Sequence, residues 1–394
     1  MKKLLRLPSF YLSLPLLLTC GLTVLTYDLP PDYLEGLLLL VTMALAIFAF
    51  DLVAGTRLPA SALFRRRDYA GTRDGFVALL LAALIIVFCL LDLTLFPIPL
   101  FATPSAYANM EGGRDHIRHV SDMCWVLPPI GMLCTRHKGL RAALIAVGFL
   151  FPVLVIDRNR IFAALFSVVL VILLRRDDAR PLPWKSVTLL VLGGATLFSV
   201  LGILRSGTLD YVTLPFSDMY KAAPQGVKWL LLYASAGPYN FGSILAKQYT
   251  DSHFLFNQLV PMSGSIATAG TGIPLDAANI NVGTEFFPFL MAWGPMGAAG
   301  SIVALYALLL WSVRRLQPTV PLFGLLIFLR VSYTCLMAPF APQAFTWTNA
   351  GFILLCLLLQ LIAALLPNHR QSDAPGLIDS ALPASRGMVP PRLS

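Results

Sequence analysis

The sequence predicts an all-α, polytopic membrane protein with about ten transmembrane helices. Hydrophobic residues make up 57% of the 394-residue chain, charged residues make up only 12%, and the mean hydropathy is +0.75. These values lie well outside the range of ordinary soluble domains. Apolar stretches that approach the roughly 20 residues a helix needs to cross a bilayer recur along most of the chain. We therefore expect one integral membrane domain over residues 1–366.

Ten hydrophobic segments carry this prediction. The segment 228–246 is either an eleventh span or a helix at the membrane interface, and its internal AGPYNFG favours the interface. The ten segments cover about residues 10–27, 33–53, 76–96, 120–135, 142–156, 161–174, 186–204, 284–311, 319–338 and 345–366.

The distribution of Lys and Arg predicts the orientation of these segments, because cytoplasmic loops are enriched in both residues. With the amino terminus inside, 20 of the 29 Lys and Arg residues fall in cytoplasmic segments, eight fall on the opposite side, and Arg330 lies within a span. We therefore expect both termini in the cytoplasm. The net charge of +9 follows from this topology and does not indicate a nucleic-acid partner. Residues 367–394 are rich in Pro, Ser and Ala and are predicted to form a disordered cytoplasmic tail.

The stretch DRNR, residues 157–160, places two arginines between two apolar runs. Basic clusters precede and follow this region, so residues 142–174 are predicted to enter the membrane and return as a hairpin with DRNR at its tip. Each leg reaches only about 25 Å at 1.5 Å per residue, less than the roughly 30 Å hydrocarbon core. Arginine at that depth usually faces a cavity, a partner or a substrate, and an anion bound by Arg158 and Arg160 would offset its cost. The alternative is that Asp157 pairs with one arginine and the others extend to the interface.

Two further arginines are candidates for the same anion. Arg205, in GILRSG, lies where the seventh span leaves the membrane, and Arg330, in IFLRVSY, lies well inside the ninth span. A structural pair of Arg330 with Asp92 or Glu285 is the alternative. Arginine suits a diphosphate because its planar fork makes bidentate contacts and keeps its charge when dehydrated.

The outer segment from about 205 to 283 is far longer than the other connections. Long loops are usually functional or disordered, and this one is predicted to form a lid over a cleft at membrane level, or else a plain flexible loop. Its aromatic stretch VKWLLLYASAGPYNFGSIL suits the outer leaflet. Asn and Asp side chains suit sugar hydroxyls, so the predicted glycan-binding residues are Asn240, Asp276, Asn281 and Thr284.

Taken together, the outer hairpin DRNR, the later outer LRSG, the long outer loop and NVGTEFFPFLMAWGPMG resemble bacterial oligosaccharide repeat-unit polymerases. These are the Wzy-type O-antigen and exopolysaccharide polymerases, which are related to the O-antigen ligases. The resemblance covers roughly residues 140–312. Arg160 and Arg205 match the family's outer arginines, and Asn281 with Thr284 match its pattern before the next span. The chain departs from the family by having AWGPMG where an acidic residue often precedes the glycine.

The resemblance implies a GT-C-like glycosyltransferase of the bacterial inner membrane. Its donor and acceptor would both be undecaprenyl-pyrophosphate-linked glycans, joined at the periplasmic face, with a chain-length regulator and a flippase as partners. Pyrophosphate leaves readily, so we expect no metal and no cofactor. A general base could activate the acceptor hydroxyl, and the candidates are His253 and Glu285, with Asp276 behind them. Ordinary loop polarity is the alternative explanation for all three.

Three other functions stay open. An O-antigen ligase would use the same arginines to transfer finished glycan to a lipid A core. A polyprenyl-phosphate sugar transferase would use the acidic first outer loop, through Asp28, Asp32 and Glu35. A lipid-linked glycan flippase would bind the same diphosphate without reaction, but transporters commonly carry repeated halves, and the sequence shows no convincing internal repeat.

Overall fold

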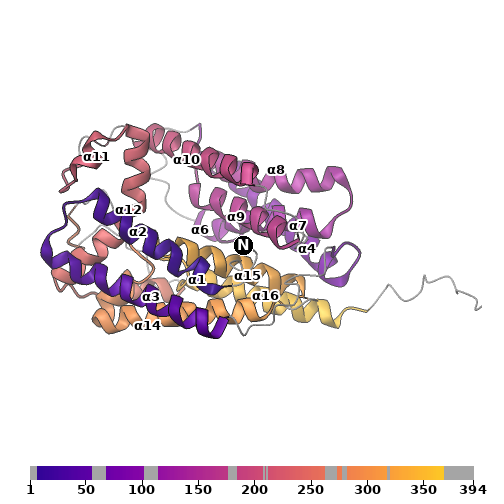
Figure 1. Ribbon diagram of the computed structural model, residues 1–394. Coiled ribbons are helices and arrows are strands. Elements are labelled where there is room, and N and C mark those ends of the chain that lie inside the picture. The colour runs from indigo at the N-terminus through magenta and orange to yellow at the C-terminus, as the bar shows by residue number, and fades with distance from the viewer. Residues whose placement is uncertain are drawn as a thin grey trace, which may run out of the picture.

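The computed structural model describes residues 7–55, 68–101, 114–175, 184–206, 209, 212–261, 273–276, 282–316 and 320–367. Within these residues the protein is all-helical, apart from one isolated antiparallel bridge between Tyr27 and Phe216 (Figure 1). The predicted helical fold class is confirmed. Five helices are long and apolar enough to cross a membrane: Pro8–Thr26, Pro31–Val53, Arg73–Leu95, Phe287–Arg314 and Trp347–Leu365. The shorter apolar helix Leu322–Met337 lies among them in the chain.

The helices follow one another along the whole described chain. In order they are α1 (Pro8–Tyr11), α2 (Ser13–Thr26), the 3-10 helix η2 (Pro31–Tyr33), α3 (Leu34–Gly55), α4 (Arg73–Leu95), α6 (Arg114–Ser121), the 3-10 helix η3 (Asp122–Val126), α7 (Leu127–Cys134), α8 (Lys138–Leu154), α9 (Arg158–Arg175), α10 (Trp184–Ser206), α11 (Asp218–Ala222), α12 (Gln225–Ala246), α13 (Ser252–Leu259), α14 (Phe287–Arg314), α15 (Leu322–Met337) and α16 (Trp347–Leu365).

Each predicted hydrophobic segment falls on one or more of these helices, and several are interrupted. The segment 10–27 is divided between α1 and α2, and α14 leaves helical geometry at Trp293 and Gly294. The segment 120–135 is divided into the end of α6, η3 and α7. Proline occupies the first turn of α7, where it suits a helix start because it has no N–H to donate. The count of ten spans and their orientation in the membrane stay predictions.

The predicted hairpin at DRNR is present. Helices α8 and α9 have 17 and 18 residues, about 25 to 27 Å each, and pack on one another. The turn between them contains Ile156 with a positive φ of 52°. Asp157 then caps α9, because its Oδ1 accepts the backbone N–H of Arg160 at 3.1 Å.

Helix α12 packs inside the protein, against α2, α3 and α10. This helix is not among those apolar enough to cross a membrane, although every residue of its second half from Ser235 to Ile244 is buried against other helices. Its placement at the membrane interface stays a prediction. Glycine permits the close packing: a Cβ added at Gly36 of α3 would lie 2.7 Å from the Cα of Gly242.

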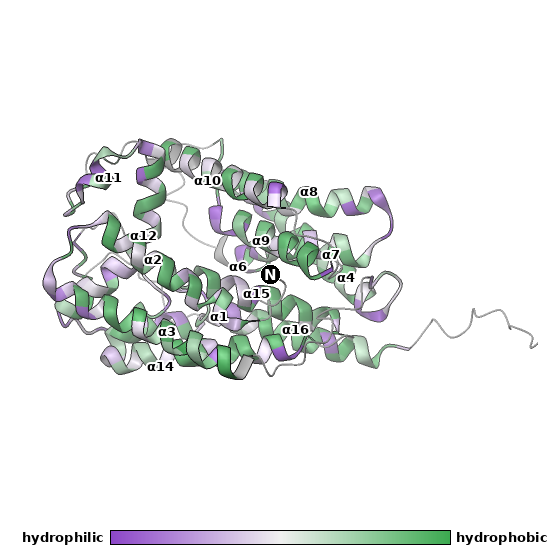
Figure 2. Cartoon of the chain, in the orientation of Figure 1, coloured by the Kyte–Doolittle hydropathy of each residue, from purple (hydrophilic) through white to green (hydrophobic). Residues whose placement is uncertain are grey.

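The outer surface of the bundle is apolar along several helices. Figure 2 shows hydrophobic residues along most of the ribbon and hydrophilic ones concentrated near helix ends and connections. Leu38 of α3, Leu80 of α4 and Leu358 of α16 are all at least half exposed. Such surfaces are suited to lipid rather than to water. All six cysteines are buried and unpaired, as their positions in apolar segments predict.

Candidate functional site

Arg160 lies buried in a cluster of carboxylates. Only 5% of its side chain is exposed, its Nε lies 3.2 Å from an oxygen of Asp157, and an Nη donates to Asp122 at the start of η3. Its guanidinium also lies 5.9 Å from the ring centre of Phe151. This pairing with Asp157 is the alternative to an anion site that the sequence leaves open for the hairpin arginines. Two carboxylates already offset the charge of Arg160, which disfavours it as the main ligand of an anion.

The two other outer arginines differ in what surrounds them. Arg158 donates from Nη2 to the hydroxyl of Tyr233 at 2.9 Å, and its guanidinium lies 5.0 Å from that ring centre. It therefore ties the hairpin tip to α12. Arg205 belongs to α10, but its side chain lies outside the described part of the structure.

Among the described residues, one nitrogen of the Arg330 guanidinium is hydrogen-bonded, and the other two are not. Its Nε donates to Oδ1 of Asn349 at 2.9 Å, and its guanidinium lies 6.0 Å from the ring centre of Trp125. Within the described residues, Nη1 and Nη2 have no hydrogen-bond acceptor, and no ion-pair contact joins Arg330 to Asp92 or Glu285, although the buried carboxylate of Glu285 lies close enough to attract the guanidinium electrostatically. The two Nη groups form the outer edge of the guanidinium fork, which is the edge that grips a carboxylate or phosphate in a bidentate contact.

Glu285 holds the chain that leads into α16. It is buried, and its carboxylate accepts the backbone N–H groups of Gln343, Ala344 and Phe345, the last two at 2.8 and 2.9 Å. Its own N–H donates to the carbonyl of Ala338 at 2.6 Å. We call Glu285 with residues 338–346 the clamp. A carboxylate has about four acceptor positions, and three are used here, so the geometry favours a structural role over general base catalysis.

Asn349 joins the clamp to Arg330. Its Nδ2 donates to the carbonyl of Ala344 at 2.8 Å, while its Oδ1 receives the bond from Arg330. Thr346 caps α16 by accepting the N–H of Asn349 at 3.2 Å. The orientation of the guanidinium is therefore fixed through a capped helix start and a buried carboxylate.

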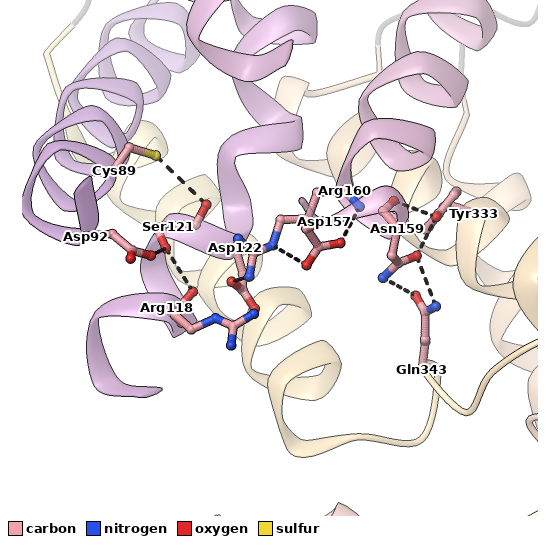
Figure 3. A network of polar contacts seen from close by, with 10 residues as sticks. All are labelled: Cys89, Asp92, Arg118, Ser121, Asp122, Asp157, Asn159, Arg160, Tyr333 and Gln343. Atoms are coloured by element: carbon pink, nitrogen blue, oxygen red, sulfur yellow. Dashed lines mark hydrogen bonds and ion pairs between the residues drawn. The ribbon is translucent and has the colours of Figure 1, made fainter. Parts of the chain in front are cut away.

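A pair of side-chain amides connects the clamp to the hairpin tip. Asn159 and Gln343 bond to each other reciprocally, at 3.3 Å from Nδ2 to Oε1 and 3.1 Å from Nε2 to Oδ1. The hydroxyl of Tyr333, one turn after Arg330 on α15, lies 2.5 Å from Oδ1 of Asn159 and 2.8 Å from its backbone carbonyl. Figure 3 shows these three side chains meeting beside Arg160 and Asp157.

The polar contacts continue on the other side of Arg160 into α4. Ser121 donates to Asp92 at 3.2 Å, and the thiol of Cys89 lies 3.9 Å from the carbonyl oxygen of Ser121. Figure 3 shows this part of the network next to Asp122. Segments far apart in the sequence, from α4 to α16, thus contribute to one polar region within an apolar bundle.

The predicted glycan-binding residues are placed differently. Asn240 is buried in α12 and donates to the carbonyl of Val282 at 2.8 Å, so it holds the chain that enters α14. Thr284 is buried next to the clamp, and its hydroxyl has no hydrogen-bond partner within the described residues. Asn281 lies outside the described residues. Neither Asn240 nor Thr284 is exposed to a ligand in this arrangement.

Asp276 is engaged by three donors. The hydroxyls of Tyr33 and Tyr239 donate to its Oδ2 at 2.8 and 3.0 Å, and Lys247 pairs with its Oδ1 at 2.5 Å. Burial raises the pKa of Asp276, but the bonds from Lys247, Tyr33 and Tyr239 outweigh burial and hold the pKa below its ordinary value. Asp276 is therefore a latch that ties residues 273–276 to α12 and η2, and a depressed pKa does not suit a general base at neutral pH.

His253 makes no hydrogen bond or ion pair with the polar region among the described residues. It is exposed near the start of α13, and its backbone N–H donates to the capping carboxylate of Asp251 at 2.8 Å. None of the contacts described for His253 connects it to Arg330 or to the clamp. No hydrogen bond therefore joins the two predicted general bases, although Phe254, next to His253, packs against Phe287 with ring centres 6.5 Å apart.

The chain matches no family model, and no curated protein or solved structure is significantly similar to it.

Several residues of the polar region are absent from the sequence prediction. Asn349, Gln343 and Tyr333 are uncharged, Asp122 lies at the start of the predicted segment 120–135, and each acquires its role from a partner distant in the chain. One local pattern was available for Asn349. Thr346 followed three residues later by Asn349 is a cap at the start of an apolar run, which predicts a helix start there.

Proposed function

We propose that this protein is a glycosyltransferase that polymerises undecaprenyl-pyrophosphate-linked oligosaccharide repeat units at the periplasmic face of a bacterial inner membrane. The observation that carries the proposal is the guanidinium of Arg330. It belongs to an apolar helix, is fixed at Nε by Asn349, and keeps both Nη groups without an acceptor among the described residues. Arginine is costly in such a position, and intramembrane arginines are usually functional.

A lipid-linked diphosphate fits this fork for two reasons. Its oxygens match the two parallel N–H groups of a guanidinium, and its lipid chain can lie along an apolar helix surface. Arginine keeps its charge when it is dehydrated, which suits Arg330 to binding an anion in a water-poor site. Arg158 and Arg205 would add positive charge on the outer side, as the sequence predicts.

The reaction then needs little from the protein beyond binding and orientation. An acceptor hydroxyl oxygen forms a bond to the anomeric carbon of the donor, the bond from that carbon to the diphosphate oxygen breaks, and undecaprenyl pyrophosphate leaves with the electron pair. The hydroxyl proton passes to water. Arg330 contributes by stabilising the negative charge that develops on the departing diphosphate, which electrostatic groups in water-poor sites do effectively.

Deletion of the gene in its host, followed by complementation, tests the proposal. Surface and lipid-linked glycans are separated on gels for cells that carry the wild type, Arg330→Ala, Arg330→Lys or Arg136→Ala. Arg136 is the matched control, since its side chain is 72% exposed and pairs with Asp68 far from the clamp in the chain. Immunoblots of membranes confirm equal amounts of each variant.

We expect the deletion strain and the Arg330→Ala strain to accumulate carrier lipid with a single repeat unit, and the Arg136→Ala strain to make the full ladder. Arg330→Lys should restore only short chains, because lysine is a point charge without a bidentate edge. A full ladder from Arg330→Ala would contradict the proposal. Polymer that accumulates on carrier without transfer to lipid A would indicate a ligase, and carrier retained on the cytoplasmic side would indicate a flippase.

A further inference from the structure

The amide pair formed by Asn159 and Gln343 has features of a binding surface. Asn159 is exposed and Gln343 is partly exposed, yet their amides bond to each other across a sequence separation of 184 residues. The pair is neutral, unlike the arginine and carboxylate clusters on either side of it. Neutral amides combine donors and acceptors, as sugar hydroxyls do.

Asn159 is anchored through its side-chain amide and Gln343 through its main chain. The hydroxyl of buried Tyr333 fixes Asn159, and the carboxylate of Glu285 fixes the backbone N–H of Gln343. Groups that are already ordered before binding lose less conformational entropy when a ligand arrives. A flexible surface pair would not have this advantage.

The pair also keeps unused hydrogen-bonding capacity. Each amide has two N–H groups and a carbonyl oxygen with two lone pairs, and the reciprocal bonds use one N–H of each. One N–H on each amide and one lone pair on Oε1 of Gln343 stay available. Among the described residues, no further side-chain bonds occupy them.

The position of the pair relative to Arg330 decides what kind of ligand it would take. Tyr333 follows Arg330 by one turn of α15, which puts both side chains on the same face of the helix. A second path runs from Arg330 through Asn349 to the carbonyl of Ala344, directly after Gln343 in the chain. Two short paths, one through Tyr333 and one through Asn349 and Ala344, therefore connect the amide pair to Arg330.

We propose that Asn159 and Gln343 form a saccharide subsite that binds hydroxyl or acetamido groups of the sugar attached directly to the diphosphate. The inference rests on the proposed function, because the first sugar of a lipid-linked glycan must lie next to the group that holds its diphosphate. It assigns two residues that specify the sugar, separate from the arginine that holds the phosphate.

Two probes test the subsite separately from the proposed function. The saccharide probe is the repeat-unit oligosaccharide released from the host's carrier lipid by mild acid, and its binding to protein in nanodiscs is followed by saturation-transfer NMR, which detects weak complexes. The lipid probe is undecaprenyl pyrophosphate without sugar, followed by native mass spectrometry. The variants are Asn159→Ala, Gln343→Ala and Arg330→Ala, with Asn257→Ala of α13 as the matched control.

We expect Asn159→Ala and Gln343→Ala each to weaken saccharide binding about three- to tenfold, as loss of neutral hydrogen bonds does, with binding of undecaprenyl pyrophosphate unchanged. Arg330→Ala should show the opposite pattern, and Asn257→Ala should bind both probes normally. Retained lipid binding shows that a variant is folded. Gln343→Ala is the safer variant, since the bond from its backbone N–H to Glu285 is kept.

Two results would overturn the inference, and they differ from failure of the proposed function. If wild type binds both probes and the two amide variants bind the saccharide as well as wild type, the amide pair is only a clasp between α9 and the clamp. If wild type binds undecaprenyl pyrophosphate but not the released saccharide, the subsite does not exist. If wild type does not bind undecaprenyl pyrophosphate, the proposed function fails and the inference fails with it.

Discussion

Replacement of Glu285 by alanine should destabilise the protein through the loss of one acceptor for three backbone donors. The bond from Ala344 is buried, while those from Gln343 and Phe345 are partly buried. A buried donor left without an acceptor costs about 2 kcal/mol, and donors that water reaches cost about 1 kcal/mol each. The total is about 4 kcal/mol, which should lower the midpoint of thermal unfolding by about 5 °C.

The assay is thermal unfolding of purified protein in detergent, with Glu35→Ala as the control. Glu35 is exposed at the start of α3, so its loss removes at most a helix-dipole interaction of about 0.3–1 kcal/mol. The activity of Glu285→Gln separates the two roles considered for this residue. If Glu285 has a structural role, Glu285→Gln should lower activity and thermal stability together. Unchanged stability with abolished activity would refute the clamp and restore Glu285 as the general base.

Four other substitutions test the packing, the ion pairs and the pH dependence of the structure. Gly237→Ala would place a Cβ 2.0 Å from a carbonyl oxygen of the clamp, and it should lower the free energy of unfolding by about 1–3 kcal/mol. Gly300→Ala is the control, because nothing lies within 4 Å of the added Cβ, and it should leave stability unchanged or raise it. Arg160→Ala leaves two carboxylates without their partner and should cost about 3 kcal/mol in the same assay. Because the pKa of Asp276 is depressed in the folded protein, its latch should be intact at neutral pH and weaken as the pH falls through that depressed value. Limited proteolysis at a series of pH values should show that residues 273–276 of the wild type are cleaved faster at low pH. In Asp276→Asn they should be cleaved equally fast at every pH.

The helical architecture could be predicted from the sequence because lipid leaves the backbone few choices. A segment in hydrocarbon must satisfy its hydrogen bonds internally, so apolar length and helix coincide along most of this chain. The hairpin at residues 157–160 was predictable for a related reason, since basic clusters on both sides required the chain to return. The burial of the second half of α12 could not be predicted, because its small residues look polar and irregular in sequence but permit close packing on α3.

The candidate site was predictable only in part. Rare charged residues in apolar segments, such as Arg160 and Arg330, are conspicuous in any sequence of this composition. Their partners are not, because the distance from Asn159 to Gln343 along the chain is 184 residues and nothing local indicates that they meet. Glu285 shows the same limit. A carboxylate at the start of a span suggests a base, and only the tertiary structure shows three backbone donors directed at it.

The most direct test of the central claim is a reaction with purified components. Protein reconstituted in nanodiscs is incubated with carrier lipid that bears a single repeat unit, and mass spectrometry follows both the glycan length and the released undecaprenyl pyrophosphate. We predict a ladder of longer glycans, with one undecaprenyl pyrophosphate released for each linkage formed, and no ladder with Arg330→Ala. Starting material that stays unchanged with folded wild-type protein, or a ladder that persists in Arg330→Ala, would contradict the account.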